Sequence, residues 1–492
     1  MTGNAPTALV PTVSLAVGVL TASVASLSWW WGASLIVFAI VFYLLVLRQC
    51  GDPVKAFRAA KWHVIWVVML FLGIGMLDEY CQRPLTLKDA HKGAGPAFIS
   101  GEIASILPKT YGDRLEVVLS GTNGAKAQIR SGATTLSTGD IISFPTSYLK
   151  EISSDTIAVT AKIAPMLKSH GILYTAFIPT KHITHQGQAN SFRNFCANLR
   201  SEIEIKIERS HLKKETSDFI KAILMGDKSG LNEETRLTFS NGGIAHMLAL
   251  SGLHMGILAG MLMWMMWPVR ALGKYKWGYA AAIALLWGYV FITGMSHSSV
   301  RACIMISFAF AAIIMERKNA VGHALCSACL LILLVAPSAL FDAGFQLSVV
   351  CVASLIAFAS RLNPIRHRQH PRLYRVCEAL LATMVATASS WAFISYYFGQ
   401  VPLMFLPTNL LLLPLVPLYL CLSVVFTALL CIGFEFNLLG FILDQGYRFL
   451  LWSADFLSYG SSYILDYQIP LYGLIAWIGI LSISAIALHR NS

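Results

Sequence analysis

The chain has 492 residues, of which 56% are hydrophobic and only 13% are charged, and its mean hydropathy is +0.63. A soluble domain carries about 25% charged residues, so this composition excludes a soluble globular protein, a disordered chain and a disulfide scaffold. It predicts a polytopic α-helical membrane protein with a formal net charge of +12.

Apolar runs long enough to cross a bilayer follow one another along the chain. A spanning helix needs about 20 mostly apolar residues, and such runs lie near residues 8–28, 31–47, 63–77, 241–267, 278–294, 299–315, 320–337, 345–360, 378–398, 403–432, 436–460 and 469–488. Prolines interrupt 403–432 and charged residues interrupt 436–460, so some of these helices could be broken or re-entrant. We predict about 11 transmembrane helices. The first run lacks the basic segment of a signal peptide and is expected to be a retained span.

Charged residues are concentrated in one part of the chain, because 37 of the 62 lie between Asp78 and Arg236. A polar insert therefore interrupts a membrane chain. The predicted domains are N-terminal transmembrane helices at 1–77, a polar domain at 78–190, an amphipathic helical connector at 191–240 and a second transmembrane domain at 241–492.

The loop cations predict the orientation of the chain. Outside the insert, 15 of the 17 Lys and Arg residues fall on one side when the spans alternate. Cytoplasmic loops are enriched in Lys and Arg, so that side is cytoplasmic and the insert is extracytoplasmic. Arg301 and Arg448 are the two cations outside this pattern.

The insert begins with short β-like runs separated by turn residues. These runs are Phe98–Ile106, Asp113–Leu119, Lys126–Arg130, Asp140–Phe144 and Ser154–Ile163. Five short strands in about 65 residues are typical of a small OB-like β-barrel, a fold used for oligonucleotides and oligosaccharides. An SH3-like barrel fits nearly as well. From Ser191 to Thr238 the pattern becomes helical and strongly charged.

Cysteines give little information about function. Cys81 and Cys196 lie in the insert, where an oxidising compartment permits a disulfide. Their separation is not fixed by the sequence, so the paired and unpaired states both stay open. Cys326 and Cys329 form a C-x-x-C within an apolar run without a second pair, and we expect apolar packing there rather than a redox or metal site.

One apolar span, beginning at Asn241, contains unusual polar residues. These are His246, Ser251 and His254. Polar groups at membrane depth are costly and usually face a bundle interior or an aqueous cavity. On a continuous helix the two histidines are two turns apart and about 80° offset, so one face could hold both.

The same span carries Gly252, Gly256 and Gly260 at G-x-x-x-G spacing. This spacing is typical of close helix packing in lipid. Packing accounts for the glycines but not for the three polar residues, to which we assign a functional role.

Further polar positions have two interpretations each. Arg301 at the outer end of a span either snorkels to the interface or binds a phosphate or carboxylate. Asp342 could cap a helix, while Gln346 and Ser348 could bond to neighbouring helices. Asn409 lies between prolines and would either satisfy freed backbone groups or line a pore.

Motifs of common enzymes are missing from the sequence. It has no G-x-x-x-x-G-K-[ST] phosphate loop and no H-E-x-x-H metal motif, and it has no G-x-S-x-G elbow. We therefore expect no catalytic residues, no metal, no cofactor and no built-in ATPase.

Several of these segments, in this order, resemble the ComEC family of bacterial competence proteins, the inner-membrane channels for DNA uptake. The matching segments are Ala222–Leu231, His246–Gly256, Arg301, Asp342–Ser348, Tyr397–Pro402 and Asn409. The Ser-Gly-Leu-His block is the most specific of them, and Ala343 departs from the family's frequent proline. The resemblance extends from the first spans to about residue 430.

The resemblance implies an inner-membrane channel that translocates single-stranded DNA into the cytoplasm during natural transformation. The implied pathway residues are His246, Ser251, Gly252, His254, Arg301, Asp342, Gln346 and Asn409. The implied partners are single-stranded DNA, membrane lipids, a periplasmic DNA receptor and a cytoplasmic DNA motor. The sequence lacks a His-x-His-x-Asp-His pattern, so it looks like a short form without the family's C-terminal metallo-β-lactamase-like domain.

An alternative function is an intramembrane enzyme that acts on a lipid-linked or envelope substrate. His246, Ser251, His254 and Asp342 have the chemistry for nucleophile activation. A secondary transporter would show paired internal repeats with broken helices, and the sequence has no convincing repeat.

Overall fold

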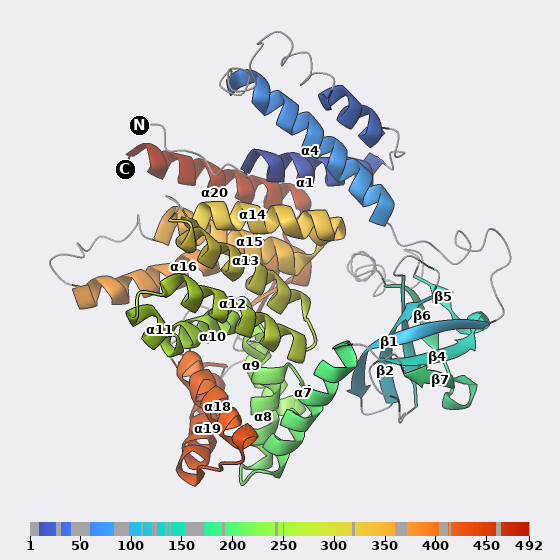
Figure 1. The fold of residues 1–492 in the computed structure, drawn as a ribbon, viewed down its shortest axis with the longest axis vertical. Helices are drawn as coiled ribbons and strands as arrows, with labels where there is room; N and C mark the ends of the chain where they lie inside the picture. The colour runs from blue at the N-terminus through green and yellow to red at the C-terminus, as the bar shows by residue number, and fades with distance from the viewer. Residues whose placement is uncertain are drawn as a thin grey trace. The chain divides into compact units, whose positions relative to one another are not determined.

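The computed structural model of the chain describes residues 9–25, 31–40, 60–82, 98–109, 112–120, 122, 125–132, 136, 139–152, 172–188, 192–241, 245–248, 250–316, 320–359, 371–402, 412, 415–458 and 464–491. The chain divides into two compact units. Unit 1 holds Met1–Asn194 and Cys326–Phe345, and unit 2 holds Phe195–Leu325 and Gln346–Ser492. Helices dominate, and one large sheet lies in unit 1 (Figure 1).

Unit 1 combines helices with a seven-stranded sheet. Its elements are α1 (Leu9–Ala25), α4 (Ala60–Gln82), β1 (Phe98–Lys109), β2 (Gly112–Leu119), β3 (Lys126–Ser131), β4 (Asp140–Pro145), η1 (Thr146–Tyr148), β5 (Lys150–Glu151), β6 (Ile172–Phe177), η2 (Thr180–His182), β7 (Thr184–Gln188) and η4 (Pro337–Phe341). Two helices, α14 (Ala320–Val335) and α15 (Ala343–Ser354), contain the points where the chain returns to unit 1 and leaves it again.

Helices α1 and α4 pack through glycines. A Cβ atom at Gly18 would lie 2.2 Å from the carbonyl oxygen of Leu72, and one at Gly75 would lie 2.4 Å from that of Leu15. The two backbones therefore approach more closely than any side chain would allow, as in small-residue packing of membrane helices.

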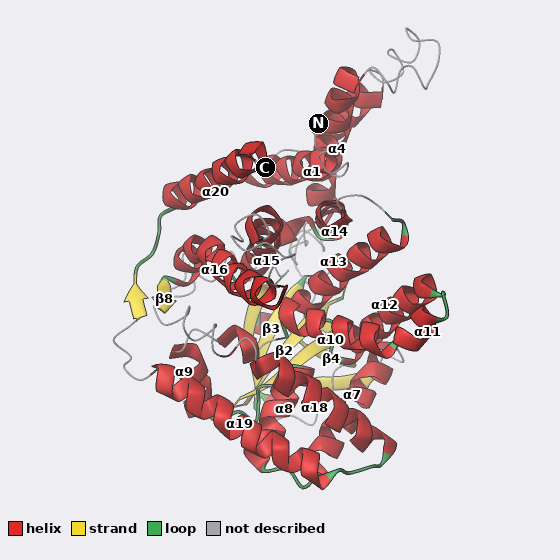
Figure 2. Cartoon of the chain, turned by 90° about the vertical axis from the view of Figure 1, so that its left-hand side faces the viewer, coloured by secondary structure: helices red, strands yellow, loops and turns green. Residues whose placement is uncertain are grey.

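The sheet has the strand order β5-β6-β3-β2-β1-β4-β7. Strand β1 pairs antiparallel with both β2 and β4, whereas β3 pairs parallel with β6. Figure 2 draws these strands in yellow. Leu115, Val117 and Leu119 on β2 are buried, because alternate side chains of a strand point to the same face. They form one core with Ile103 and Phe144.

Four of the five strands predicted in the insert are confirmed as β1, β2, β3 and β4. The fifth, Ser154–Ile163, lies outside the described residues. Strand β7 was not predicted because its sequence, THQGQ, has no apolar alternation, and it joins the sheet by pairing with β4. Long-range pairing here outweighs weak local preference.

Unit 2 is helical apart from one small strand pair. Its elements are α7 (Phe192–Arg209, which begins in unit 1), α8 (Lys214–Met225), α9 (Glu233–Asn241), η3 (Ala245–Leu248), α10 (Gly252–Met265), α11 (Trp267–Ala271), α12 (Tyr275–Ile292), α13 (His297–Ile314), the π-helical turn η5 (Leu355–Ala359), α16 (Pro371–Phe398), β8 (Gln400–Pro402), α18 (Leu415–Ile432), α19 (Asn437–Ser458), β9 (Ile464–Asp466) and α20 (Leu471–Asn491).

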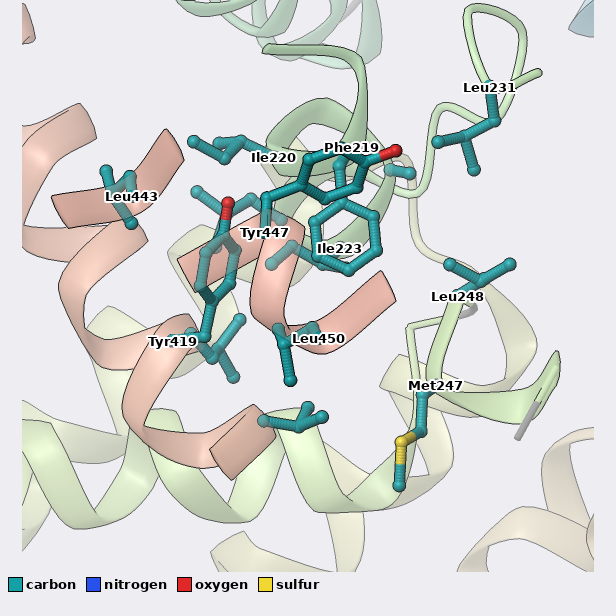
Figure 3. Close-up of a cluster of buried hydrophobic side chains, with 14 of the residues drawn as sticks. Phe219, Ile220, Ile223, Leu231, Met247, Leu248, Tyr419, Leu443, Tyr447 and Leu450 are labelled. Carbon is teal, nitrogen blue, oxygen red and sulfur yellow. The ribbon is translucent and has the colours of Figure 1, made fainter. Parts of the chain in front are cut away.

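An extended buried cluster of unit 2 surrounds Phe219 on α8. The Phe219 ring centroid lies 5.7 Å from that of Phe239, 5.5 Å from that of Tyr419 and 5.0 Å from that of Tyr447. Figure 3 shows members of this cluster, contributed by α8, α18, α19 and the η3 turn. The charged connector is thus packed by its apolar face against helices from the far end of the chain.

Three of the described helices are long and apolar enough to cross a membrane, namely His297–Ile314, Cys377–Phe398 and Leu415–Ile432. Shorter apolar helices accompany them at Leu9–Ser23, Trp31–Ile40, Val67–Asp78, Gly252–Met265, Val321–Val335, Ala343–Phe358 and Leu471–Ala485. These helices fit a helical membrane protein. The total of about 11 spans stays a prediction.

The continuous helix predicted over 241–267 is wrong. Helix α9 ends at Asn241, a 3₁₀ turn follows in η3, and α10 begins only at Gly252. Ser251 has an extended backbone, with φ −120° and ψ 169°, as the residue before a helix usually does. His246 and His254 therefore do not share one helix.

Candidate functional site

The helix break places a serine–histidine pair at the start of α10. Ser251 Oγ and His254 Nδ1 share a hydrogen bond of 2.8 Å, and the side chain of His254 is fully buried. A serine before a helix commonly accepts a backbone N–H of the first turn. Within the described residues the Ser251 hydroxyl makes no such cap bond and instead fixes the imidazole ring.

Apolar side chains of neighbouring helices surround this start of α10. Met255 is fully buried in a cluster with Leu286 of α12 and Cys303 of α13. A Cβ atom at Gly252 would lie 4.0 Å from the Cβ atom of Ala302. The first turn of α10 therefore packs beside α13, next to the residue that follows Arg301.

The loop between α8 and α9 packs against η3 and Leu250, the segment just before α10. Helix α8 ends at Gly226, whose φ of +76° suits glycine in a left-handed cap. A Cβ atom at Gly226 would lie 3.1 Å from Leu250 Cδ1, and Leu231 shares a buried cluster with Met247 and Leu248. Figure 3 shows Leu231, Leu248 and Met247 in that cluster. Two segments some twenty residues apart in sequence thus form one structure.

A buried ion pair on α8 is in direct contact with this loop. Lys221 Nζ lies 2.8 Å from Asp218 Oδ1, and the two side chains are only 12% and 8% exposed. A Cβ atom at Gly230 would lie 2.4 Å from that carboxylate oxygen, so the loop rests directly on it. Burial alone would lower the pKa of Lys221, but the hydrogen bond and the charge of Asp218 outweigh burial and raise it.

The loop also carries two cations. Burial and the charge of Arg236 together lower the pKa of Lys228. The guanidinium of Arg236 donates a hydrogen bond to the carbonyl oxygen of Lys228. Asp227 Oδ1 accepts the backbone N–H of Ser229 at 2.9 Å, which closes the turn.

Helix α12 is tied to the connector at two points. The Tyr289 hydroxyl donates to the carbonyl oxygen of Leu224 at the end of α8. Arg200 Nη1 of α7 lies 3.4 Å from the carbonyl oxygen of Thr293, just beyond α12, where a cation satisfies free carbonyl groups. Arg200 is itself held by Glu204 at 2.8 Å.

A second polar group of unit 2 joins α15 to α16. The Tyr397 hydroxyl donates to Gln346 Oε1 at 2.9 Å. Just beyond α16, β8 pairs antiparallel with β9, and Ser395 Oγ accepts the backbone N–H of Ile469 at 3.2 Å. The sequence pointed to Gln346 but not to its partner, because Tyr397 lies 51 residues away.

Asp342, in unit 1, accepts the backbone N–H groups of Gly344 and Phe345, each at 3.2 Å. Asp342 thus makes the bonds of a helix cap at the start of α15. A role for Asp342 in a pathway stays a prediction.

The remaining predicted residues are placed as follows. The His246 backbone lies in η3, and its side chain is outside the described residues. Asn409 lies outside them entirely. Arg301 is half-buried near the start of α13. The structure brings Ser251, Gly252 and His254 together, with Arg301 adjacent to the helix contact.

The glycine seam predicted on α10 is not formed. Cβ atoms at Gly256 and Gly260 would meet nothing within 4 Å in the described part of the chain, and both residues are exposed. The close glycine packing of this protein lies instead between α1 and α4. A backbone carbonyl lies opposite Gly18 and Gly75, whereas no described backbone atom lies within 4 Å of a Cβ atom at Gly256 or Gly260.

A disulfide between Cys81 and Cys196 is wrong for this structure, since Cys196 is a free thiol. Its side chain is only 5% exposed, so the sulfur is turned into the packed face of α7. Within the described residues no group of three His, Cys, Asp or Glu side chains could hold a metal ion.

Comparisons with known proteins cover the region of this site. A family model described as "Competence protein" matches residues 223–491, more than half of the chain. ComE operon protein 3 of Bacillus subtilis (strain 168) is 27% identical over 232 residues, which are 47% of this chain and 29% of that protein. Competence protein ComA of Neisseria gonorrhoeae is 27% identical over 249 residues, 48% of this chain and 34% of that protein.

The matched region is therefore about a third of the length of these curated relatives. No solved structure matches the chain. The matching segment includes Ser251, Gly252, His254, Arg301 and Gln346.

Proposed function

The chain belongs to the ComEC-type competence protein family, and we propose from this membership that it translocates single-stranded DNA across the cytoplasmic membrane. Membership of the family supports a role in DNA uptake. That role, the passage of one strand, the route it takes and the partners it meets form the proposal.

One observation carries the proposal: Ser251 and the fully buried His254 are hydrogen-bonded at a helix break, next to the apolar cluster that contains Met255. A strand with charged phosphates cannot cross hydrocarbon without a polar path. Interrupted helices at membrane depth are tolerated where they line a cavity or are buried in protein. The break before α10 has the features expected of such a path.

The sheet of unit 1 supports a further part of the proposal, an extracytoplasmic OB-like domain that meets incoming DNA. OB folds are small, partly open Greek-key barrels that bind oligonucleotides. The double pairing of β1 and the parallel pair β3–β6 are compatible with such a barrel. A periplasmic receptor would deliver the DNA, and a cytoplasmic motor would draw it in.

Uptake of labelled DNA tests the proposal. In a strain that lacks the gene, we expect label to stay outside the cytoplasm, and the wild-type gene should restore entry. Ser251→Ala and His254→Ala should each reduce entry at least tenfold. Each substitution removes the hydrogen bond between Ser251 Oγ and His254 Nδ1, which fixes the imidazole ring.

Ser423→Ala is the matched control, since Ser423 is fully buried but bonds only within its own helix, to the carbonyl oxygen of Tyr419. It should leave entry near the wild-type level. Unchanged transformation in the deletion strain would refute the proposed function.

A second candidate is an intramembrane enzyme acting on an envelope substrate, favoured by the same 2.8 Å bond between Ser251 Oγ and His254 Nδ1. A hydroxyl bonded to an imidazole is the beginning of an activated nucleophile. Altered envelope lipids or glycans in Ser251→Ala cells, with normal DNA entry, would support this candidate over the channel.

A further inference from the structure

Two cations lie close together where the loop after α8 leads into α9. Lys228 lies in the loop and Arg236 in α9, and the Arg236 guanidinium donates to the Lys228 carbonyl oxygen. The Lys228 side chain is half-buried, whereas Arg236 is exposed. Lys228 is thus partly shielded from water, and Arg236 lies at the surface near it.

Described carboxylates do not neutralise this pair. Among the residues that the structure describes, no Asp or Glu forms an ion pair with Lys228 or Arg236. Asp218 is engaged by Lys221 at 2.8 Å, and Asp227 accepts the Ser229 N–H. Burial, and after it the nearby charge of Arg236, lowers the pKa of Lys228, because both disfavour the charged ammonium.

The fold holds the loop in one conformation. Gly226 ends α8 with a left-handed backbone, Gly230 rests on the Asp218 carboxylate, and Leu231 is buried beside the η3 turn. A rigid, unneutralised cation pair is suited to bind an anion, because its orientation needs no reorganisation on binding.

We propose that Lys228 and Arg236 form a binding site for a phosphodiester group of the DNA strand, beside the turn that carries Ser251. The guanidinium can engage two phosphate oxygens, and the ammonium acts as a point charge. This inference rests on the proposed function, and it assigns a contact of the strand to the loop that packs against the segment before Ser251.

The test measures binding of a fluorescent single-stranded oligo(dT) to the full chain in nanodiscs of zwitterionic lipid, over a range of salt concentrations. Each phosphate contact on a single strand contributes about 0.7 to the slope of log K against log salt. Because the two cations share one phosphodiester group, Lys228→Gln and Arg236→Gln should each reduce the slope, and the double variant should reduce it by about 0.7 in total. Affinity should fall correspondingly.

Two controls make the result specific. Lys214→Gln removes one exposed charge from the other end of α8 and should leave the slope unchanged. An oligonucleotide with uncharged methylphosphonate linkages should bind the wild type and the variants alike. Arg236→Lys should retain the slope of log K against log salt. If Arg236 only stabilised the loop, Arg236→Gln would lower the thermal stability of the chain without changing this slope.

Wild-type slopes in Lys228→Gln and Arg236→Gln would overturn the inference and leave the channel proposal standing. A change only in the anionic lipid that co-purifies with the chain would also overturn it, because the pair would then bind a lipid headgroup. Failure of the proposed function would appear differently, as normal DNA entry in the deletion strain.

Discussion

Ser251 and His254 illustrate what single residues reveal in a membrane chain. Both stood out in the sequence because polar groups are costly among apolar neighbours. Their hydrogen bond was not predictable, since it depends on a helix start at Gly252. Had residues 241–267 formed one helix, Ser251 Oγ would have been free to bond its own backbone.

At the same scale, the Asp218–Lys221 pair gives a stability prediction. Asp218→Asn leaves the ammonium of Lys221 with little exposure and with the exposed Glu208 carboxylate, 3.9 Å away, as its remaining ion-pair partner, so we expect a loss of about 3 kcal/mol in the free energy of unfolding. Unfolding in mixed micelles, followed by tryptophan fluorescence, measures it. Glu202→Gln breaks the exposed Lys206–Glu202 pair and should cost less than about 0.5 kcal/mol.

The pH dependence of this pair has a definite sign. Because the pKa of Lys221 is raised above its ordinary value of 10.5, the stabilisation is complete below pH 10.5 and is lost as pH rises through the raised value. Equal alkaline profiles in wild type and Asp218→Asn would show that Lys221 is not held by Asp218.

At the scale of elements, glycine spacing alone does not identify the packed face of a helix. Gly252, Gly256 and Gly260 have the spacing of a packing seam, yet the backbone contacts occur at Gly18 and Gly75. Spacing specifies which residues share a helix face, but it does not specify whether another helix covers that face. The partner helix is set by the whole fold, which is why this prediction failed.

This contrast predicts opposite effects of an alanine substitution at Gly18 and at Gly256. Gly18→Ala places a methyl group against the Leu72 carbonyl oxygen and should destabilise the chain by about 1–3 kcal/mol, as overpacking does. Gly256→Ala meets no described atom within 4 Å and should stabilise α10 by up to about 1 kcal/mol. Unfolding in mixed micelles compares them, and the same sign for both variants would contradict the packing described.

Strands and helix breaks differ in how far local sequence determines them. Four strands of the insert were predictable because alternate residues such as Ile103 and Val117 are apolar. The charged residues of 436–460 predicted a weak span, and α19, a continuous helix there, is not among the described helices that are apolar enough to cross a membrane. Its Asp444 accepts the Lys213 backbone N–H at 3.3 Å, a contact between distant segments that no local pattern contains.

For the whole molecule, motifs that follow one another in the sequence do not all lie together in the fold. The segments around Gly226 and Ser251 pack together in unit 2. Gln346 instead bonds to Tyr397 of α16. Composition was sufficient to identify a membrane chain, and resemblance was sufficient to identify the family. The grouping of polar residues into separate clusters required the fold.

The pairing of β8 with β9 constrains how the chain is threaded through a membrane. Gln400–Pro402 and Ile464–Asp466 are hydrogen-bonded neighbours, so they lie on the same side of the bilayer. The intervening chain must then cross an even number of times, whatever path residues 403–463 follow. Phe398→Cys and Tyr467→Cys, in a chain with its own cysteines replaced by serine, should react with an impermeant maleimide from the same side. Labelling from opposite sides would contradict the strand pair. Labelling from the same side would indicate that α18 and α19 either both cross the membrane or both do not.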